Sequence, residues 1–301
     1  MLNSRIRLHN LPLHLMVLPG LILLAIFSYA PMAGIIIAFQ KFIPAKGLFG
    51  PQQWVGFANF EYAWKLPGAR RVLWNTFYIS SMKLVMGIVV PVVFTLLLNE
   101  VRNAFMRRSV QTMIYLPHFI SWIILGGILI DILSPTSGIV NRLLGYFGIE
   151  PIFFLGDNAW FPYTLVATNT WKEFGFGTIV YLAAIAGIDP QLYEAARIDG
   201  ASRIRQAWHV TLPGMSMVIV LLSVLSLGNI LNAGFDQVFN LYNPQVYESG
   251  DIIDTFVYRT GLMDAQYSLA AAVGLFKSVV SFVLISVAYF FAYRFANYRI
   301  F

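Results

Sequence analysis

The chain has 301 residues, of which 58% are hydrophobic and only 11% are charged, and its formal net charge is +6. An average soluble domain is about 25% charged, so these few charges cannot cover a water-facing surface. This composition, with a mean hydropathy of +0.69, excludes a soluble globular, disordered, collagen-like or coiled-coil protein. The sequence also has no cysteine, which excludes disulfides, thiolate nucleophiles and cysteine-based metal sites.

Six stretches are apolar and long enough to cross a bilayer core, which takes about 20 helical residues. In chain order they cover about residues 11–39, 75–98, 110–133, 161–188, 215–235 and 269–295. The first contains Pro19 and Pro31, which are expected to kink it or to set its ends. It is too long for a signal-peptide core and no A-x-A site follows it, so we expect a retained span. The predicted fold is an all-α integral membrane protein, with residues 1–301 forming one transmembrane domain.

Six spans place both termini on one side of the membrane, and cytoplasmic segments carry an excess of lysine and arginine. The segments on the side of the termini carry Arg5, Arg7, Arg102, Arg107, Arg108, Arg197, Arg203, Arg205, Arg294 and Arg299. The opposite segments, which include three long loops, carry Lys41, Lys46, Lys65, Arg70, Arg71, Arg142 and Arg259. This bias predicts cytoplasmic termini. The basic residues are spread between apolar runs, so no nucleic-acid partner is expected.

Ionisable residues inside membrane spans are rare and suggest function by default. Lys83 lies about a third of the way through the second predicted span. It either pairs with a carboxylate or carbonyl group inside the bundle or lines a translocation path. Lys172 and Glu173 are neighbours on one helix and need not pair; a bend at the glycines that follow them would suit the wall of such a path. Asp131 and Lys277 are expected near span ends, where a long lysine reaches the interface.

The fifth predicted span carries a polar stripe. Asn229, Asn232, Asp236 and Asn240 are spaced 3, 4 and 4 residues apart, which places them on one helical face. Such a stripe must face protein or water, so it either forms hydrogen bonds between helices or binds the hydroxyls of a substrate. The aromatic residues that would stack on a substrate ring, or simply pack within the bundle, are Tyr78, Trp122, Trp171 and Tyr242.

No catalytic constellation is found in the sequence. It contains no G-x-x-x-x-G-K-[ST] phosphate loop, so the chain is not expected to bind ATP by that device. The H-E-x-x-H and G-x-S-x-G motifs are also absent, so neither a metal site nor a nucleophile is expected. An intramembrane enzyme is therefore disfavoured. A secondary transporter driven by an ion gradient, with Lys83, Lys172 and Glu173 as relay groups, remains as the alternative, although no inverted repeat is evident.

The loop between the fourth and fifth spans, residues 189–213, has clear helix punctuation. Asp189 is a suitable N-cap and Pro190 a suitable first helical residue. Gly200 can adopt the left-handed conformation that ends a helix, and Ser202 can cap a second helix that leads to Pro213. These residues predict a helical hairpin outside the membrane.

The same loop resembles the EAA loop of permease subunits of binding-protein-dependent ABC importers. The resemblance rests on Glu194-Ala195-Ala196, on Gly200 six residues after the glutamate, and on the later Val-x-Leu-Pro, in which valine stands where isoleucine is common. Segments such as WVGFANF, LLNEVRN, YLPHFISW and NPQVYESGDIIDTFVYRTGL are similar to LplB-type carbohydrate permeases, which are related to the MalF-type sugar permeases. The resemblance extends over nearly the whole chain.

The resemblance implies the type I ABC importer permease fold and a bacterial cytoplasmic (inner) membrane location. It implies a coupling helix at about residues 190–199, and its ATPase-coupling residues would be Tyr193, Glu194, Ala195, Ala196, Asp199, Gly200, Leu212 and Pro213. The implied partners are a second homologous permease chain in a heterodimer, two cytoplasmic ATPase subunits that bind ATP and Mg, and an extracellular solute-binding protein. The substrate would be an oligosaccharide, with an acidic one as a candidate.

Overall fold

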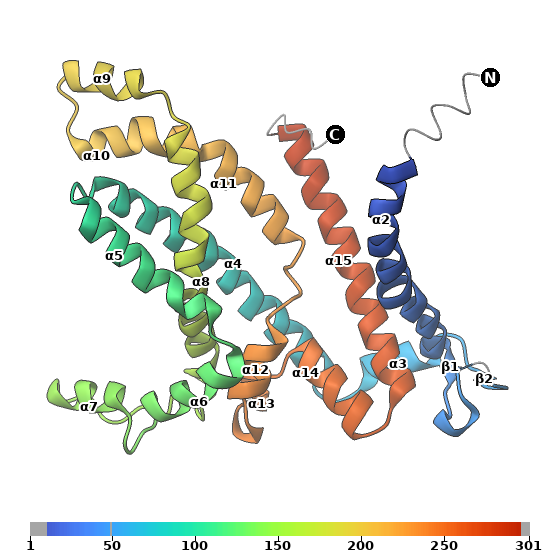
Figure 1. Ribbon diagram of the computed structural model, residues 1–301. Helices are drawn as coiled ribbons and strands as arrows, with labels where there is room; N and C mark the ends of the chain where they lie inside the picture. The colour runs from blue at the N-terminus through green and yellow to red at the C-terminus, as the bar shows by residue number, and fades with distance from the viewer. Residues whose placement is uncertain (1–10, 49, 296–301) are drawn as a thin grey trace, which may run out of the picture. The chain divides into compact units, whose positions relative to one another are not determined.

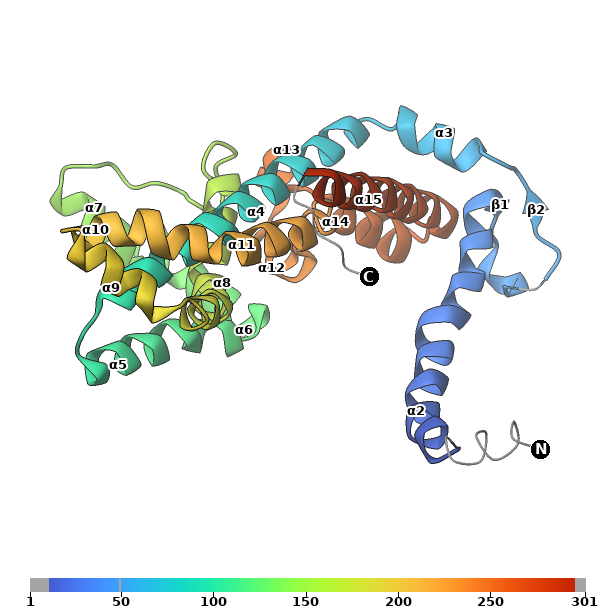
Figure 2. The same ribbon diagram turned by 90° about the horizontal axis from the view of Figure 1, so that it is seen from above.

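Figures 1 and 2 show a computed structural model that describes residues 11–48 and 50–295, with side chains up to residue 290. The basic residues Arg5, Arg7, Arg294 and Arg299, used above for orientation, therefore have no described side chains. The chain divides into two compact units, Met1–Leu66 with Val257–Phe276 and Pro67–Phe256 with Lys277–Phe301.

In the first unit, one continuous helical stretch begins the described chain. It consists of α2 (Leu11–Leu24), the π-helical η1 (Ala25–Tyr29) and the 3-10 helix η2 (Ala30–Phe39). The elements that follow are β1 (Gln40–Lys41), η3 (Pro44–Lys46), β2 (Gln53–Trp54) and α3 (Ala58–Lys65). The two short strands pair antiparallel, with Gln40 opposite Trp54. Pro19 lies inside α2 and Pro31 in the first turn of η2, so neither proline ends the span, which continues to Phe39.

Aromatic packing and one asparagine fix the end of this first helical stretch. The ring of Phe39 contacts the rings of Trp54, Phe57 and Phe60 at centroid distances between 5.3 and 5.8 Å. Asn59 donates from Nδ2 to the backbone carbonyls of residues 38 and 40 at 2.8 and 3.0 Å. The rest of the unit comes from η7 (Arg259–Met263) and the first part of α15 (Tyr267–Phe295).

The second unit contains the elements that carry the candidate site. In chain order these are α4 (Ala69–Glu100), α5 (Ala104–Tyr115), η4 (Leu116–Phe119), α6 (Trp122–Ile132), α7 (Ile139–Tyr146), α8 (Phe161–Ala186), α9 (Pro190–Ile198), α10 (Arg203–Gln206), η5 (Ala207–Thr211), α11 (Leu212–Leu227), α12 (Phe235–Leu241), η6 (Pro244–Val246) and α13 (Tyr247–Gly250). The unit also includes most of α14 (Ile253–Tyr258), up to Phe256, and α15 from Lys277 onward. Helix α8 packs against α4, α5, α11 and α12. Helices α9 and α10 lie at one end of this unit and α6, α7, α12 and α13 at the other (Figure 1).

Two clusters of buried apolar residues hold the second unit together. The larger cluster includes Ile79 of α4, Leu125 of α6, Leu165 of α8 and Val238 of α12, which are all nearly inaccessible. The smaller cluster joins Val92 and Tyr181 to Met215 of α11. Because α8 contributes to both clusters, it forms the centre of the unit, and the remaining apolar surface of its neighbours is left outward as in a lipid-facing protein.

The described helices give up to six spans. Four helical stretches, Leu11–Phe39, Ala69–Glu100, Arg203–Leu227 and Tyr267–Phe290, are long and apolar enough by themselves. Two further pairs qualify as bent spans, Ala104–Phe119 with Trp122–Ile132 at 105° and Phe161–Ala186 with Pro190–Ile198 at 73°. The predicted class of fold, an all-α multi-span membrane protein, is confirmed.

The third and fifth spans differ from their predicted form. The third is broken after η4, where a 3-10 turn with Pro117 ends one helix and Ser121 caps the next by accepting from the Ile124 amide at 3.4 Å. The fifth begins earlier than predicted and its helix ends at Leu227, so residues 228–234 are not helical as predicted. Gly234 has a φ of +86°, a conformation that suits glycine and interrupts the helix.

Gly175 serves close helix packing, and α8 continues as one α-helix through it. A Cβ atom built on Gly175 would lie 1.9 Å from the carbonyl oxygen of Ile114 in α5. We expect Gly175→Ala to destabilise the protein by about 1–3 kcal/mol, because the two backbones must move apart. Thermal unfolding of the purified chain measures this. Gly127→Ala, which meets open space, is the control, and equal melting temperatures for the two variants would contradict the prediction.

Candidate functional site

The loop between α8 and α10 folds as the hairpin that its residues predict. The carboxylate of Asp189 accepts a hydrogen bond from the Gln191 amide at 2.9 Å and caps α9, and Pro190 is the first helical residue. At the other end, the amide of Ala201 donates to the Ala196 carbonyl at 2.8 Å. Gly200, with a φ of +73°, therefore occupies the left-handed position of a Schellman motif.

The second arm of the hairpin is one continuous helical stretch through α10, η5 and α11. Ser202 caps it by accepting from the Arg205 amide at 3.4 Å. Leu212 and Pro213 form the first turn of α11, so they stand at the entrance to the membrane-spanning helix. The two arms thus join the coupling-loop candidates directly to the fourth and fifth spans.

Two side-chain contacts tie this hairpin to the spans. The hydroxyls of Tyr193 in α9 and Thr211 in η5 lie 3.0 Å apart. Arg203 Nη1 lies 3.2 Å from the carboxylate of Glu100 at the end of α4. Both partners of this ion pair are roughly half exposed, so the pair contributes little stability, but it links α10 to the second span.

The outer surface of the hairpin is unusually apolar for a segment outside the bundle. Leu192, Ile198, Ile204 and Trp208 are 53%, 86%, 73% and 61% exposed, and Glu194 is exposed beside them. Exposed apolar groups of this size are typical of surfaces that contact another protein or a membrane. The sequence already indicates an apolar side of α9 that includes Leu192 and Ile198. Ile204 and Trp208 were missed, although large apolar residues within an otherwise polar loop were the available signal.

A polar cavity of about 210 Å³ lies between α4, α8 and the break after α11. Its lining residues are Ser80, Lys83, Leu84, Asn169, Ser226, Asn229, Asn232, Ala233 and Gly234. Three predicted path residues, Lys83, Asn229 and Asn232, therefore meet at one place. Ser80, Asn169 and Ser226 were missed, although each is a polar residue within an apolar stretch of the sequence.

Lys83 is 9% exposed and lies on the cavity wall. Its Nζ donates to the carbonyl oxygen of Ala233 at 2.5 Å and to Oε1 of Gln237. Gln237 in turn donates from Nε2 to the Leu165 carbonyl and to the Thr168 hydroxyl, each at 2.8 Å. Lys83 therefore has the carbonyl partner inside the bundle that one interpretation expected, and it also lies beside a polar cavity.

The predicted four-residue stripe is wrong, because the helix on which it depends is interrupted. Asn229 and Asn232 lie in the turn after α11 and line the cavity. Asp236 and Asn240 belong to α12, and Asn240 donates to the Asp236 carbonyl at 2.7 Å. The Cβ of Asn240 packs close to Gly126 of α6. The positive φ of Gly234 turns the chain between the two pairs.

Lys172 and Glu173 pair, although their adjacency on one helix does not require it. Lys172 Nζ lies 3.0 Å from Glu173 Oε1 and donates to the backbone carbonyl of His118 at 2.7 Å. Glu173 Oε2 lies 2.7 Å from His118 Nδ1, and the His118 ring stacks on Phe176 at a centroid distance of 4.1 Å. The histidine at the break of the third span brings the two neighbours together, which the sequence did not reveal.

The predicted aromatic residues are dispersed. Trp122 lies under the Lys172 ammonium, with Nζ 5.6 Å from the ring centroid. The hydroxyl of Tyr78 donates to that of Tyr163 at 3.1 Å, and both side chains line a separate apolar groove of about 550 Å³. Trp171 is 46% exposed, and Tyr242 packs against other aromatic rings near the end of α12. None of these four lines the polar cavity.

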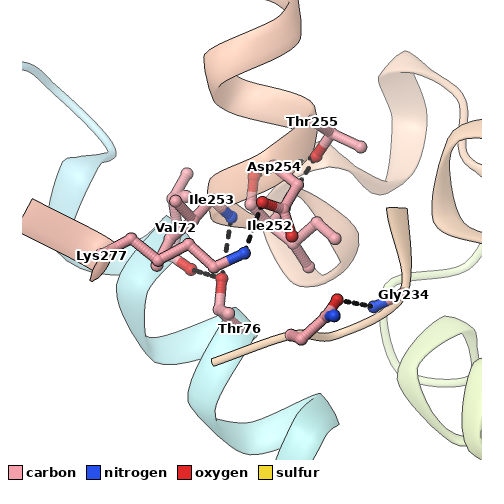
Figure 3. A network of polar contacts seen from close by, with 9 residues as sticks. Val72, Thr76, Gly234, Ile252, Ile253, Asp254, Thr255 and Lys277 are labelled. Carbon is pink, nitrogen blue, oxygen red and sulfur yellow. Dashed lines mark hydrogen bonds and ion pairs between the residues drawn. The ribbon is translucent and has the colours of Figure 1, made fainter. Parts of the chain in front are cut away.

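Lys277 was expected near the end of a span. It lies instead in the interior of α15. Its Nζ lies 2.5 Å from Asp254 Oδ1 of α14 (Figure 3). In the same network, Thr76 of α4 donates to the Val72 carbonyl and accepts from the Ile253 amide at 2.8 Å. This ion pair therefore keeps a charged lysine within a membrane helix. In the part of the chain that the structure describes, no group of three His, Cys, Asp or Glu residues is arranged to hold a metal ion.

The comparisons with known proteins identify the class to which this hairpin and cavity belong. Residues 84–297 match the family described as "Binding-protein-dependent transport system inner membrane component". The chain belongs to this family and is a multi-pass membrane component of a transport system, as the resemblance of its EAA loop implied. Membership does not support the alternatives of a secondary transporter or an intramembrane enzyme.

Two curated relatives of Bacillus subtilis are similar over almost the whole chain. The polygalacturonan/rhamnogalacturonan transport system permease protein YteP is 43% identical over 285 residues, 95% of this chain and 88% of the relative. The protein LplB is 43% identical over 283 residues, 94% of this chain and 89% of the relative. These matches confirm the resemblance to LplB-type permeases.

Two solved structures share the fold. A chain of a bacterial ABC transporter that imports the acidic polysaccharide alginate is 38% identical, with a TM-score of 0.89 over 98% of this chain and 99% of that chain. A second alginate ABC transporter structure, in complex with a periplasmic protein bound to an alginate pentasaccharide, is 39% identical, with a TM-score of 0.86 over 95% of each chain. The fold is therefore that of an ABC importer permease.

Proposed function

We propose that this chain forms half of the translocation path of an ATP-driven importer for an oligosaccharide that an extracellular solute-binding protein delivers. The observation that carries the proposal is the exposed hairpin of α9 and α10, which is joined to two spans and presents an uncovered apolar surface. The polar cavity at the break of the fifth span supports a path for a hydroxyl-rich substrate, because binding sugars requires many donors and acceptors.

Helix α9 serves as the coupling helix in this proposal. Its exposed Glu194 and Ala195, together with Leu192 and Ile198, seat in a cleft of a cytoplasmic ATPase subunit. Movement of the subunit passes through the Tyr193–Thr211 contact to the fifth span and through the ion pair of α10 with α4 to the second. Ala196, Asp199 and Gly200 maintain the turn that connects the two helices.

The proposed assembly divides the chemistry among several chains. Two cytoplasmic ATPase subunits bind ATP and Mg, and this chain supplies no nucleotide site of its own. The sequence supports this division, because it contains no phosphate-binding loop of the Walker type. A second homologous permease chain completes the path, in a heterodimer. Both termini lie in the cytoplasm, in keeping with the arginines of the hairpin and the arginine bias of the whole chain.

The proposed substrate is an acidic oligosaccharide. The relative YteP is named for the transport of polygalacturonan and rhamnogalacturonan, and the two similar structures come from importers of alginate. Polygalacturonan and alginate are polymers of uronic acids, so the sugar units of both polysaccharides carry a carboxylate. We extend that chemistry to this chain at the level of the class of substrate.

Reconstitution tests the proposed function. We expect the purified chain alone to hydrolyse no ATP, and the complex with its partner permease and ATPase subunits to hydrolyse ATP faster when the binding protein and a uronate tetrasaccharide are added. Uptake into proteoliposomes should require ATP and should be insensitive to a proton uncoupler. Robust ATPase activity of the chain alone, or uptake that the uncoupler abolishes, would contradict the proposal.

A further inference from the structure

The three lysines within the membrane helices differ in their partners. Lys172 lies 3.0 Å from a carboxylate oxygen of Glu173, and Lys277 lies 2.5 Å from one of Asp254. For Lys83, no carboxylate oxygen lies within 4.0 Å among the residues that the structure describes. Lys83 is nevertheless largely buried, with 9% of its surface exposed, and it lies on the wall of the polar cavity. A buried charge without a counter-charge is costly, so its retention calls for an explanation.

The hydrogen bonds of Lys83 leave part of its ammonium group available to the cavity. An ammonium group has three donors. One donates to the Ala233 carbonyl and another to Oε1 of Gln237, and both of these acceptors are neutral. These two bonds fix the position of the ammonium group at the cavity wall. Both bonds supply the ammonium group with neutral acceptors and no counter-charge.

Another polar group of the cavity lining lacks a hydrogen-bond partner. The hydroxyl of Ser80, one helical turn before Lys83 on α4, is fully buried and makes no hydrogen bond. Such orphaned buried groups are rare and require an explanation. The amides of Asn169, Asn229 and Asn232 and the hydroxyl of Ser226 complete the polar lining. The cavity therefore combines one unneutralised cation with several neutral donors and acceptors.

We propose that this cavity is a subsite for one uronate unit of the substrate, in which Lys83 supplies the counter-charge for the sugar carboxylate and Ser80 and the three asparagines bind its hydroxyls. The cavity volume of about 210 Å³ is below the ~300–1,000 Å³ of pockets that enclose a drug-sized ligand, so it suits one sugar unit rather than an oligosaccharide. The inference rests on the proposed function and deepens it, because it places the selection for acidic sugars within the membrane as well as in the binding protein.

The competing explanation is purely structural. Lys83 donates to a carbonyl beside the break of the fifth span. Its only role could then be to hold that break in place. In that case its removal would affect acidic and neutral sugars equally. The two explanations therefore differ in their dependence on substrate charge, which a matched pair of ligands reveals.

The experiment measures, by equilibrium dialysis, the affinity of the detergent-purified permease–ATPase complex for a labelled uronate tetrasaccharide in the absence of the binding protein. The second ligand is the same tetrasaccharide with each carboxylate chemically reduced to a primary alcohol. Charge-assisted hydrogen bonds contribute about 1.5–3 kcal/mol, so we expect the wild-type complex to bind the reduced ligand at least about tenfold more weakly. Lys83→Met should weaken binding of the uronate ligand by at least about tenfold and binding of the reduced ligand by less than about twofold.

Two further variants complete the design. Lys65→Met removes the same charge from the exposed helix α3 and should leave both affinities unchanged. Ser80→Ala should weaken the binding of both ligands by a similar factor, because it removes a hydroxyl contact and no charge. The wild-type comparison of the two ligands does not depend on the folding of any variant, so the inference stays open to refutation if Lys83→Met does not assemble.

The outcomes separate the inference from the proposed function. Equal affinity of the wild-type complex for the two ligands, or an equal loss for both in Lys83→Met, would overturn the uronate subsite. If the reconstituted complex still imports the uronate tetrasaccharide in that case, the proposed function stands and only the subsite fails. If the complex imports no uronate, the proposed substrate class fails as well.

Discussion

Replacing Gly200 by valine is expected to lower coupled transport at least about tenfold while the chain still inserts into the membrane. Gly200 has a φ of +73°, and a side chain in this region costs about 1–2 kcal/mol, with a β-branched residue among the least tolerated. A Cβ atom there would meet no other atom within 4 Å. The effect therefore comes from backbone strain at the turn, which the chain relieves by reorienting α9 relative to α10.

The consequence for coupling follows from the way in which the turn alone positions α9. The turn is held by the amides of Gly200 and Ala201, which donate to carbonyls of α9, and no residue of α9 is buried within the chain. A changed turn therefore displaces the surface that we propose contacts the ATPase subunit. Substrate-stimulated ATP hydrolysis and uptake by proteoliposomes should fall at least about tenfold, in line with the loss of about 1.4 kcal/mol of interaction free energy.

A second glycine offers a matched control. Gly148 has a φ of +74° and equally open surroundings, but it lies just after α7, at the opposite end of the second unit (Figure 1). Gly148→Val imposes the same strain away from the hairpin and should retain coupled ATP hydrolysis. Full transport activity of Gly200→Val, or an equal loss in both variants, would show that the hairpin is not the coupling element.

Removing the ammonium group of Lys277 is expected to lower the stability of the protein by about 3 kcal/mol or more, within the ~3–5 kcal/mol measured for breaking buried pairs. The pair joins α15 to α14 at 2.5 Å, and its two side chains are only 20% and 24% exposed. The second oxygen of Asp254 already has no hydrogen-bond partner. Lys277→Met would therefore leave a largely buried carboxylate without its cation.

Thermal unfolding of the detergent-purified chain measures this loss, and a double variant provides the control. Lys277→Met combined with Asp254→Leu removes both charges, and replacing a buried pair with apolar residues is often neutral. We expect the double variant to recover most of the stability that the single variant loses. A single variant as stable as the wild type, or a double variant less stable than the single, would refute a stabilising role for the pair.

The hairpin is the part of the candidate site that the sequence predicted most completely. Its N-caps, the proline in its first turn and the left-handed glycine all act within a few residues of their own position. Local hydrogen bonds of this kind do not depend on the rest of the fold. Of the exposed apolar residues of the hairpin, Ile204 and Trp208 were missed, because exposure is a property of the folded chain.

The polar cavity was only partly predicted. Lys83 and two of the asparagines were correctly selected as polar residues in apolar stretches, but the helical periodicity that grouped Asp236 and Asn240 with them does not continue past Leu227. The break at Gly234 is stabilised by Lys83 from another helix. Periodicity assumes a continuous helix, so it fails where a distant side chain supports an interruption.

The sequence by itself determined the membrane environment, the apolar stretches that form the spans and the capped helical hairpin, because hydrophobic burial in lipid and helix capping depend on composition and on neighbours in the chain. Only the tertiary structure decided which charged groups meet. His118 reaches Glu173 across 55 residues, and Lys83 reaches Gln237 across 154. Such contacts follow from the packing of helices around α8, which brings residues that are distant in the sequence close together in space. No local pattern in the sequence encodes these distances.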